Sequence, residues 1–162
     1  KNIIPGVSFS TDIIAGFPGE TYEDHLMTLE IMEKVQYDGA YMFKYSPREG
    51  TKAYKMPDDV SDEVKTKRLQ EIIELQQKIS YQRNLLLQDT EDIILVEGLS
   101  RKSDKFFAGR TSTNKVVIFP FSEGIKSGDY VKARINRVTH ATLFGDFVEL
   151  INIDKGGFAL TA

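Results

Sequence analysis

The sequence predicts an α/β segment over residues 1–88, followed by a small five-stranded OB-like β-barrel over residues 89–162. Three observations carry this prediction. A strand, turn, helix and strand pattern fills the first 45 residues, a long helical pattern follows Ser61, and five short alternating stretches begin at Ile93. The change from helical spacing to a period of two marks the boundary between two domains.

The first elements form a βαβ unit. Val7–Ile14 is rich in β-branched residues and ends at the turn residues 16–19, and Ala40–Tyr45 is a second strand. Between them, Thr21 and Asp24 have the spacing of a capping box, and apolar residues at helical spacing continue until Asp38. Because two strands joined through a helix run in the same direction, we expect a parallel pair.

A long helix is predicted from about Asp62 to Gln88. Leu69, Ile72 and Ile79 share one of its faces, and the charged residues lie mostly on the others. These charged residues are Lys65, Lys67, Glu71, Glu74 and Lys78. At 1.5 Å per residue the helix is on the order of 40 Å long, enough to cover one domain and lead to the next.

The last part of the chain alternates with the period of strands. In residues 131–136, Val, Ala and Ile alternate with Lys, Arg and Asn, which predicts one apolar and one cationic face. A small closed barrel is the arrangement of five short strands that leaves no strand edge unpaired, so we expect this fold. The predicted strands are Ile93–Glu97, Lys105–Arg110, Lys115–Phe119, Asp129–Val138 and Thr142–Leu150.

Composition limits the functions open to this segment. The 162 residues contain no Cys, which excludes disulfides, cysteine nucleophiles and thiolate ligands for zinc or iron from anything the segment does alone. No apolar run reaches the roughly 18–20 residues of a membrane span, so we expect a cytoplasmic protein without a membrane partner. Residues 93–144 carry nine Lys and Arg against four Asp and Glu, although the whole chain has a net charge of -3. This contrast favours a polyanionic partner for the barrel, with a solvated surface of scattered cations as the alternative.

Two parallel strands are too few for a complete parallel sheet, which is normally covered on both faces. We therefore expect residues 1–88 to belong to a larger barrel, with the remainder of the same protein as a partner.

Ligands of α/β folds bind where such strands end. One candidate site is the segment from Asp12 to Thr21, and the second is Tyr45–Thr51, which holds hydroxyl groups and a guanidinium. An ordinary turn and a loop of solvent-facing charges are the simpler interpretations. Neither histidine, His25 or His140, has ligand spacing, and we find no complete catalytic or metal site.

The barrel combines cations with aromatic residues, as proteins that bind single-stranded or looped RNA do. Most of the aromatics must form the core of so small a barrel. The segments 109–111 and 114–115 are therefore better candidates than any Phe. The predicted RNA-binding residues are Arg101, Lys102, Lys105, Arg110, Thr111, Asn114, Lys115 and Arg137.

Four motifs in order resemble the radical-SAM methylthiotransferase family: STDIIAGFPGET, FKYSPREGT, KTKRLQEIIELQQKIS and FAGRTSTNKVVIFP. The resemblance implies the C-terminal part of a radical-SAM partial (β/α) barrel followed by a TRAM domain, the RNA-binding barrel of this family. It further implies S-adenosylmethionine and two [4Fe–4S] clusters as cofactors and tRNA, at its anticodon stem-loop, as partner. The last motif most resembles the branch that methylthiolates isopentenylated adenosine beside the anticodon.

By this similarity, the end of the first strand would bind S-adenosylmethionine, through Asp12, Ile14, Gly16, Phe17, Pro18 and Glu20. Substrate would enter past Tyr45, Ser46 and Arg48, and Arg110, Thr111 and Lys115 would contact tRNA. The cluster cysteines of the family are absent, so we expect the segment to be inactive alone. The alternatives are an RNA-binding module without catalysis, and a methylthiotransferase acting on threonylcarbamoyl-adenosine in tRNA or on a ribosomal protein.

Overall fold

The computed structural model describes residues 3–4 and 6–151. The chain divides into two compact units, one of residues 8–80 and one of residues 81–162 together with the first seven residues. Each unit is described by itself. The domain boundary that the sequence predicts between residues 88 and 89 remains a prediction, and the division of the fold falls before Tyr81. No helix in the described part of the chain has the length and apolar character needed to cross a membrane.

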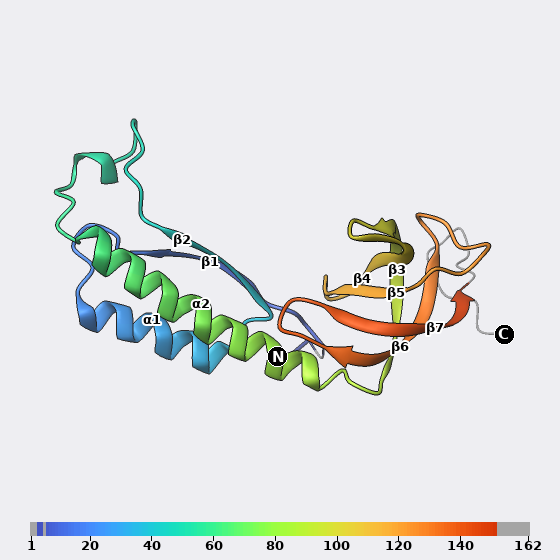
Figure 1. Ribbon diagram of the computed structural model, residues 1–162. Helices are drawn as coiled ribbons and strands as arrows, with labels where there is room; N and C mark the ends of the chain where they lie inside the picture. The colour runs from blue at the N-terminus through green and yellow to red at the C-terminus, as the bar shows by residue number, and fades with distance from the viewer. Residues whose placement is uncertain (1–2, 5, 152–162) are drawn as a thin grey trace. The chain divides into compact units, whose positions relative to one another are not determined.

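The first unit is the predicted βαβ unit. Strand β1 (Ser10–Ala15) leads to helix α1 (Tyr22–Val35) and strand β2 (Gly39–Lys44), and β1 pairs with β2 in parallel. A short 3-10 helix η1 (Ala53–Lys55) and helix α2 (Asp62–Leu85) follow. Both helices lie on the same side of the two-stranded sheet (Figure 1).

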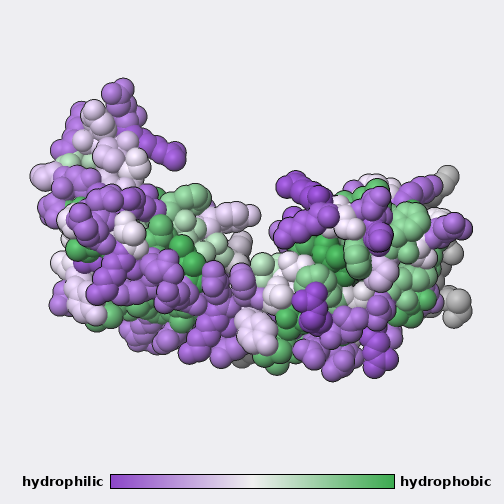
Figure 2. All heavy atoms as spheres, viewed as in Figure 1, coloured by the Kyte–Doolittle hydropathy of each residue, from purple (hydrophilic) through white to green (hydrophobic). Residues whose placement is uncertain are grey.

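The two faces of this sheet differ in their surroundings. On the helical side, Ala15 of β1 packs with Met32 of α1 and with Ile72 and Ile79 of α2, all at most 2% exposed. On the other side, Ile14 and its partner Phe43 are 51% and 56% exposed. A parallel sheet is normally covered on both faces, and no described residue covers this one. Hydrophobic surface is visible over β1 and β2 in Figure 2.

Helix α1 begins where the sequence predicts. The Thr21 hydroxyl accepts a hydrogen bond from the Asp24 N–H, and the Asp24 carboxylate accepts one from the Thr21 N–H. This capping box satisfies two backbone groups that have no partner within the helix. The helix ends at Gln36, whose φ of 56° is left-handed and turns the chain toward β2.

Helix α2 differs from its prediction at Lys65. The sequence places this residue off the apolar face, yet it is only 5% exposed, and its ammonium group lies 2.6 Å from the Asp58 carboxylate. The aliphatic stem of Lys65 packs against Gly16, where an added Cβ would lie 2.2 Å from the Lys65 Cγ. A lysine can lie on a buried face because its stem is apolar and only its head needs a polar partner.

The second unit is a closed five-stranded barrel in the order β3-β4-β5-β7-β6. All neighbours are antiparallel except β5 and β7, which are parallel. Five strands were predicted and all five are confirmed. They are β3 (Glu91–Ser100), β4 (Ser103–Thr111), β5 (Val116–Pro120), β6 (Tyr130–Val138) and β7 (Leu143–Ile151).

The barrel core follows the predicted alternation. Val131, Ala133 and Ile135 of β6 are fully buried, while the intervening residues face outward. Gly109 of β4 lies so close to β3 that an added Cβ would be 2.5 Å from the Leu95 carbonyl oxygen. The fold is therefore the predicted α/β segment followed by an OB-like barrel.

Candidate functional site

A pocket of about 470 Å³ lies on the uncovered side of the β1–β2 sheet. The strands bring Asp12 and Ile14 of β1 beside Phe43 and Lys44 of β2, and the segments after each strand complete the lining. Six of the predicted cofactor and substrate residues line it together: Asp12, Ile14, Phe17, Tyr45, Ser46 and Arg48. The structure thus joins two segments that the sequence could relate only through the expected parallel pairing.

Tyr45 forms a wall of this pocket and is held from several sides. Its hydroxyl donates a hydrogen bond to the Ala53 carbonyl at 3.2 Å, and its ring meets Phe17 edge-on at 5.2 Å between centroids. The Lys65 ammonium lies 5.2 Å from the centre of the same ring. Tyr45 is 8% exposed, so it shapes the pocket and presents little surface of its own.

The charged groups of the pocket are of both signs. Lys44 binds both carboxylate oxygens of Asp62, at 2.7 and 2.9 Å, and this hydrogen bonding holds the pKa of Asp62 below its usual value. The carboxylate of Asp12 and the guanidinium of Arg48 have no ion pair or hydrogen bond with any described residue. Both groups are therefore available to a ligand that carries opposite charges of its own.

The other three predicted cofactor residues, Gly16, Pro18 and Glu20, do not line the pocket. One Glu20 oxygen accepts hydrogen bonds from the N–H groups of Gly16 and Phe17, at 2.9 and 3.3 Å. The other oxygen accepts one from Arg68 at 2.7 Å. The N–H groups of Gly16 and Phe17 are thus occupied by a side chain of the same loop. In this structure Glu20 stabilises the loop that carries the pocket.

Sequence reasoning missed Phe43, Lys44 and Ala53 as lining residues, whereas Thr51 belongs to the predicted segment Tyr45–Thr51. The sequence of β2 contained a signal, because Tyr41 and Phe43 pair with Asp12 and Ile14 in the parallel register and so lie on the same face of the sheet.

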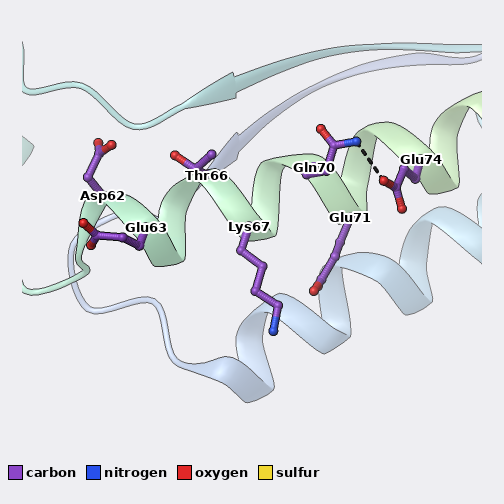
Figure 3. Close-up of a pocket in the computed structure, with 7 residues that line it drawn as sticks. All are labelled: Asp62, Glu63, Thr66, Lys67, Gln70, Glu71 and Glu74. Atoms are coloured by element: carbon purple, nitrogen blue, oxygen red, sulfur yellow. Dashed lines mark hydrogen bonds between the residues drawn. The ribbon is translucent and has the colours of Figure 1, made fainter.

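A second pocket, of about 670 Å³, is lined only by side chains of α2 (Figure 3). There Lys67 and Glu71 point toward α1, and Glu71 lies 2.6 Å from the Nε2 atom of His25. His25 is buried, with 1% of its surface exposed.

The predicted RNA-binding residues fall into two groups in the barrel. Arg101 and Lys102 in the β3–β4 turn and Lys105 at the start of β4 are exposed and have no described ion pair or side-chain hydrogen bond. In an OB-fold, the turn between the first two strands takes part in binding nucleic acid. Contact between these three exposed cations and RNA phosphates stays a prediction.

The remaining predicted residues make contacts within the barrel. Thr111 is 5% exposed, and its hydroxyl accepts a hydrogen bond from the Lys115 N–H. The Lys115 ammonium donates to the side-chain oxygen of Asn84 at 2.9 Å. Arg137 lies 3.5 Å over the ring of Phe144. Arg110 donates hydrogen bonds to Glu97 and to Asn114, at 2.9 and 3.0 Å.

A third pocket, of about 570 Å³, lies on the outer face of the barrel beside Arg110. It includes Ile93, Leu95 and Tyr130, which sequence reasoning missed and which are 39%, 37% and 36% exposed. Residues 93–96 are all apolar, so the sequence could not show which of them face outward.

The sequence of residues 93–148 matches the family model of the TRAM domain, and this range lies within the closed barrel. The barrel is a TRAM domain. The whole chain is also similar to proteins named tRNA-2-methylthio-N(6)-dimethylallyladenosine synthase. It is 51% identical to the one from Chlorobium phaeobacteroides (strain BS1) over 90% of the chain and 32% of the relative. It is 50% identical to the one from Karelsulcia muelleri, over 90% of the chain and 32% of the relative. It is 43% identical to the one from Fusobacterium nucleatum, over 91% of the chain and 34% of the relative.

These relatives confirm the methylthiotransferase resemblance found in the sequence. The chain spans about a third of the length of the curated relatives it matches. In the described part of the chain, no three His, Cys, Asp or Glu side chains are grouped so that they could hold a metal ion.

Proposed function

We propose that this chain is part of a cytoplasmic radical-SAM enzyme that transfers a methylthio group to N6-dimethylallyladenosine in tRNA. In this proposal, residues 8–80 supply one wall of the active site and the TRAM domain binds the tRNA. The observation that carries it is the 43–51% identity to synthases of that name over about 90% of the chain. The TRAM domain supports the RNA-binding half independently.

The pocket on the β1–β2 sheet fits S-adenosylmethionine, which supplies the reactive radical in the family that the sequence resembles. The exposed faces of Ile14 and Phe43 offer an apolar surface to an adenine ring. Asp12 and Arg48 have opposite charges and no side-chain partner among the described residues, so they suit the amino and carboxylate groups of such a ligand. Ser46 adds a hydroxyl at the side where the substrate adenosine would enter.

The iron–sulfur clusters do not fit this chain. Clusters of this type are held by cysteine thiolates, and the sequence has none. We therefore assign the cluster ligands to another part of the parent enzyme and derive no step from them here. What these residues do in the reaction is to bind and orient: the pocket positions one reactant, and the barrel holds the tRNA in register.

The proposal is tested on the parent enzyme in a cell strain that lacks it. Mass spectrometry of tRNA nucleosides should show loss of the methylthio-isopentenyl nucleoside and its restoration by the wild-type gene. Asp12→Asn and Arg48→Ala should each restore it poorly, whereas Lys34→Ala, a surface change on α1, should restore it fully. Persistence of that nucleoside with loss of methylthiolated threonylcarbamoyl-adenosine, or of a modified ribosomal protein, would assign the enzyme to another substrate.

A further inference from the structure

The outer pocket of the TRAM domain combines apolar surface with fixed polar groups. Tyr130 of β6, Leu95 of β3 and Arg110 of β4 are paired neighbours in the register of three adjacent strands. They form one row across the outside of the barrel, next to the exposed side chain of Ile93. The barrel in Figure 2 shows hydrophobic surface between hydrophilic residues. Apolar surface rimmed by polar residues is a feature of ligand-binding sites.

Arg110 is held rigidly at the edge of this pocket. Its Nε atom donates to Glu97 at 2.9 Å, and its Nη1 atom donates to the backbone and side-chain oxygens of Asn114, at 3.2 and 3.0 Å. Asn114 holds its position through a left-handed turn, with φ of 64° and an N–H that donates to the Thr111 carbonyl. The Nη2 atom makes no hydrogen bond with the described residues, so its two N–H donors remain for a ligand.

The charges of the pocket disfavour a phosphate. Two carboxylates, Asp92 and Glu97, line it together with one guanidinium, and Glu97 already neutralises Arg110. Asp92 is partly buried, and this burial raises the pKa of its carboxyl group. Carboxylates in such a place accept hydrogen bonds from amino and imino groups. The matching ligand is therefore flat and aromatic, with donors for carboxylates and acceptors for Arg110.

We propose that this pocket binds one unpaired guanine base of the RNA, stacked on Tyr130 and Leu95. Guanine presents two acceptors, O6 and N7, to an arginine, and its N1–H and amino group are donors for a carboxylate. Adenine and cytosine lack this combination, and uracil has no amino group. The inference rests on the RNA-binding part of the proposed function. It adds a base-reading site to the phosphate contacts expected at Arg101, Lys102 and Lys105.

The first test uses the 162-residue chain and four seven-nucleotide RNAs, UUUNUUU, in which N is G, A, C or U. The G-containing RNA should bind tightest. Tyr130→Ala should weaken binding of the G-containing RNA by about fivefold to 100-fold, as loss of one base stack does. The four RNAs should then bind this variant equally well. Tyr130→Phe keeps the ring and should bind as the wild type does. Tyr54→Ala removes an exposed ring of the other unit and is the matched control.

Equal binding of the four RNAs, or an unchanged affinity of Tyr130→Ala, would overturn the inference. If these variants still bind tRNA, only this inference fails, whereas a chain that binds no RNA at low salt contradicts the proposed function as well. Sedimentation of Tyr130→Ala and wild type tests a different occupant. A change of association state without a change in RNA affinity would assign the pocket to a protein contact and also overturn the inference. Circular dichroism checks that the variants are folded.

Discussion

At the scale of single residues, Gly16 is the position where the pocket loop depends most on the absence of a side chain. Its φ is 74°, and a Cβ there would lie 2.2 Å from the buried Lys65 Cγ. Gly16→Ala should lower the free energy of unfolding by about 2–4 kcal/mol, because backbone strain and overpacking add. Gly19→Ala is the control, since Gly19 has a φ of 82° but open space around it. Urea denaturation of both variants measures the difference, and equal losses would contradict the packing argument.

A second prediction at the residue scale concerns the stability of Glu20 variants. The Glu20 carboxylate joins two loop N–H groups to Arg68, and the two side chains are only 15% and 10% exposed. Glu20→Ala leaves the Arg68 guanidinium and the loop N–H groups without this acceptor, so unfolding should become easier by about 3 kcal/mol. Glu20→Gln keeps an acceptor and should lose less. A thermal unfolding series of the two variants with wild type checks the order, and equal stability of wild type and Glu20→Ala would refute it.

At the scale of elements, the start of α1 gives a prediction about pH. The pKa of Asp24 lies below its usual value, chiefly because of the hydrogen bond from the Thr21 N–H and also that from the Thr21 hydroxyl. A lowered pKa in the folded state contributes stability that is present above the unfolded pKa, about 3.9, and is lost as pH falls through the folded value. Asp24→Asn should therefore be less stable than wild type at pH 7, and the gap should narrow at pH 3. A gap that is constant with pH would contradict this assignment.

The end of α2 is tied to the barrel by Asn84, which is 4% exposed. Its amide group donates to the carbonyls of Thr139 and His140, at 2.8 and 3.3 Å, and its oxygen accepts from Lys115. Asn84→Leu leaves buried polar partners unsatisfied and should cost about 1–3 kcal/mol of stability. Asn84→Asp retains the acceptor for Lys115 and isolates the loss of the two donated bonds. Hydrogen exchange of the Thr139–Thr142 turn should quicken in both variants, and unchanged protection would rule out the tie.

The periodicity of the sequence predicted the helices and strands, because each of them buries one face. It could not predict which residues, distant in the sequence, contact each other. The strands of the barrel, the parallel pair and the capping box at Thr21 all follow from local spacing. The burial of Lys65 follows from the approach of Gly16, 49 positions earlier in the chain, which no local pattern encodes. Arg110 and Thr111 were selected for their chemistry, but only the fold shows that Glu97 pairs with the first and that the second is buried.

At the scale of the whole molecule, charge is divided between phosphate contacts and internal pairs. The chain has a net charge of -3, and several barrel cations are used internally, such as Arg110 with Glu97 and Lys132 with Glu149. A cation in such a pair can neutralise an RNA phosphate, and so release a counterion from the RNA, only after the pair has broken. Arg101, Lys102 and Lys105 have no such partner in the described part of the chain, so they should dominate the salt dependence of binding.

Replacing Arg101, Lys102 and Lys105 by Ala together should weaken tRNA binding for all sequences. Because each single-strand phosphate contact contributes about 0.7 to the slope of log K against log salt, the slope should fall in magnitude by about 2. Arg110→Ala removes a cation that is already neutralised, so it should change the slope much less while altering base preference. Filter binding of tRNA between 50 and 200 mM salt, on the order of the range where such slopes are measured, separates the two effects. A larger change in slope for Arg110→Ala than for the triple variant would show that the phosphates follow the outer pocket and not the turn.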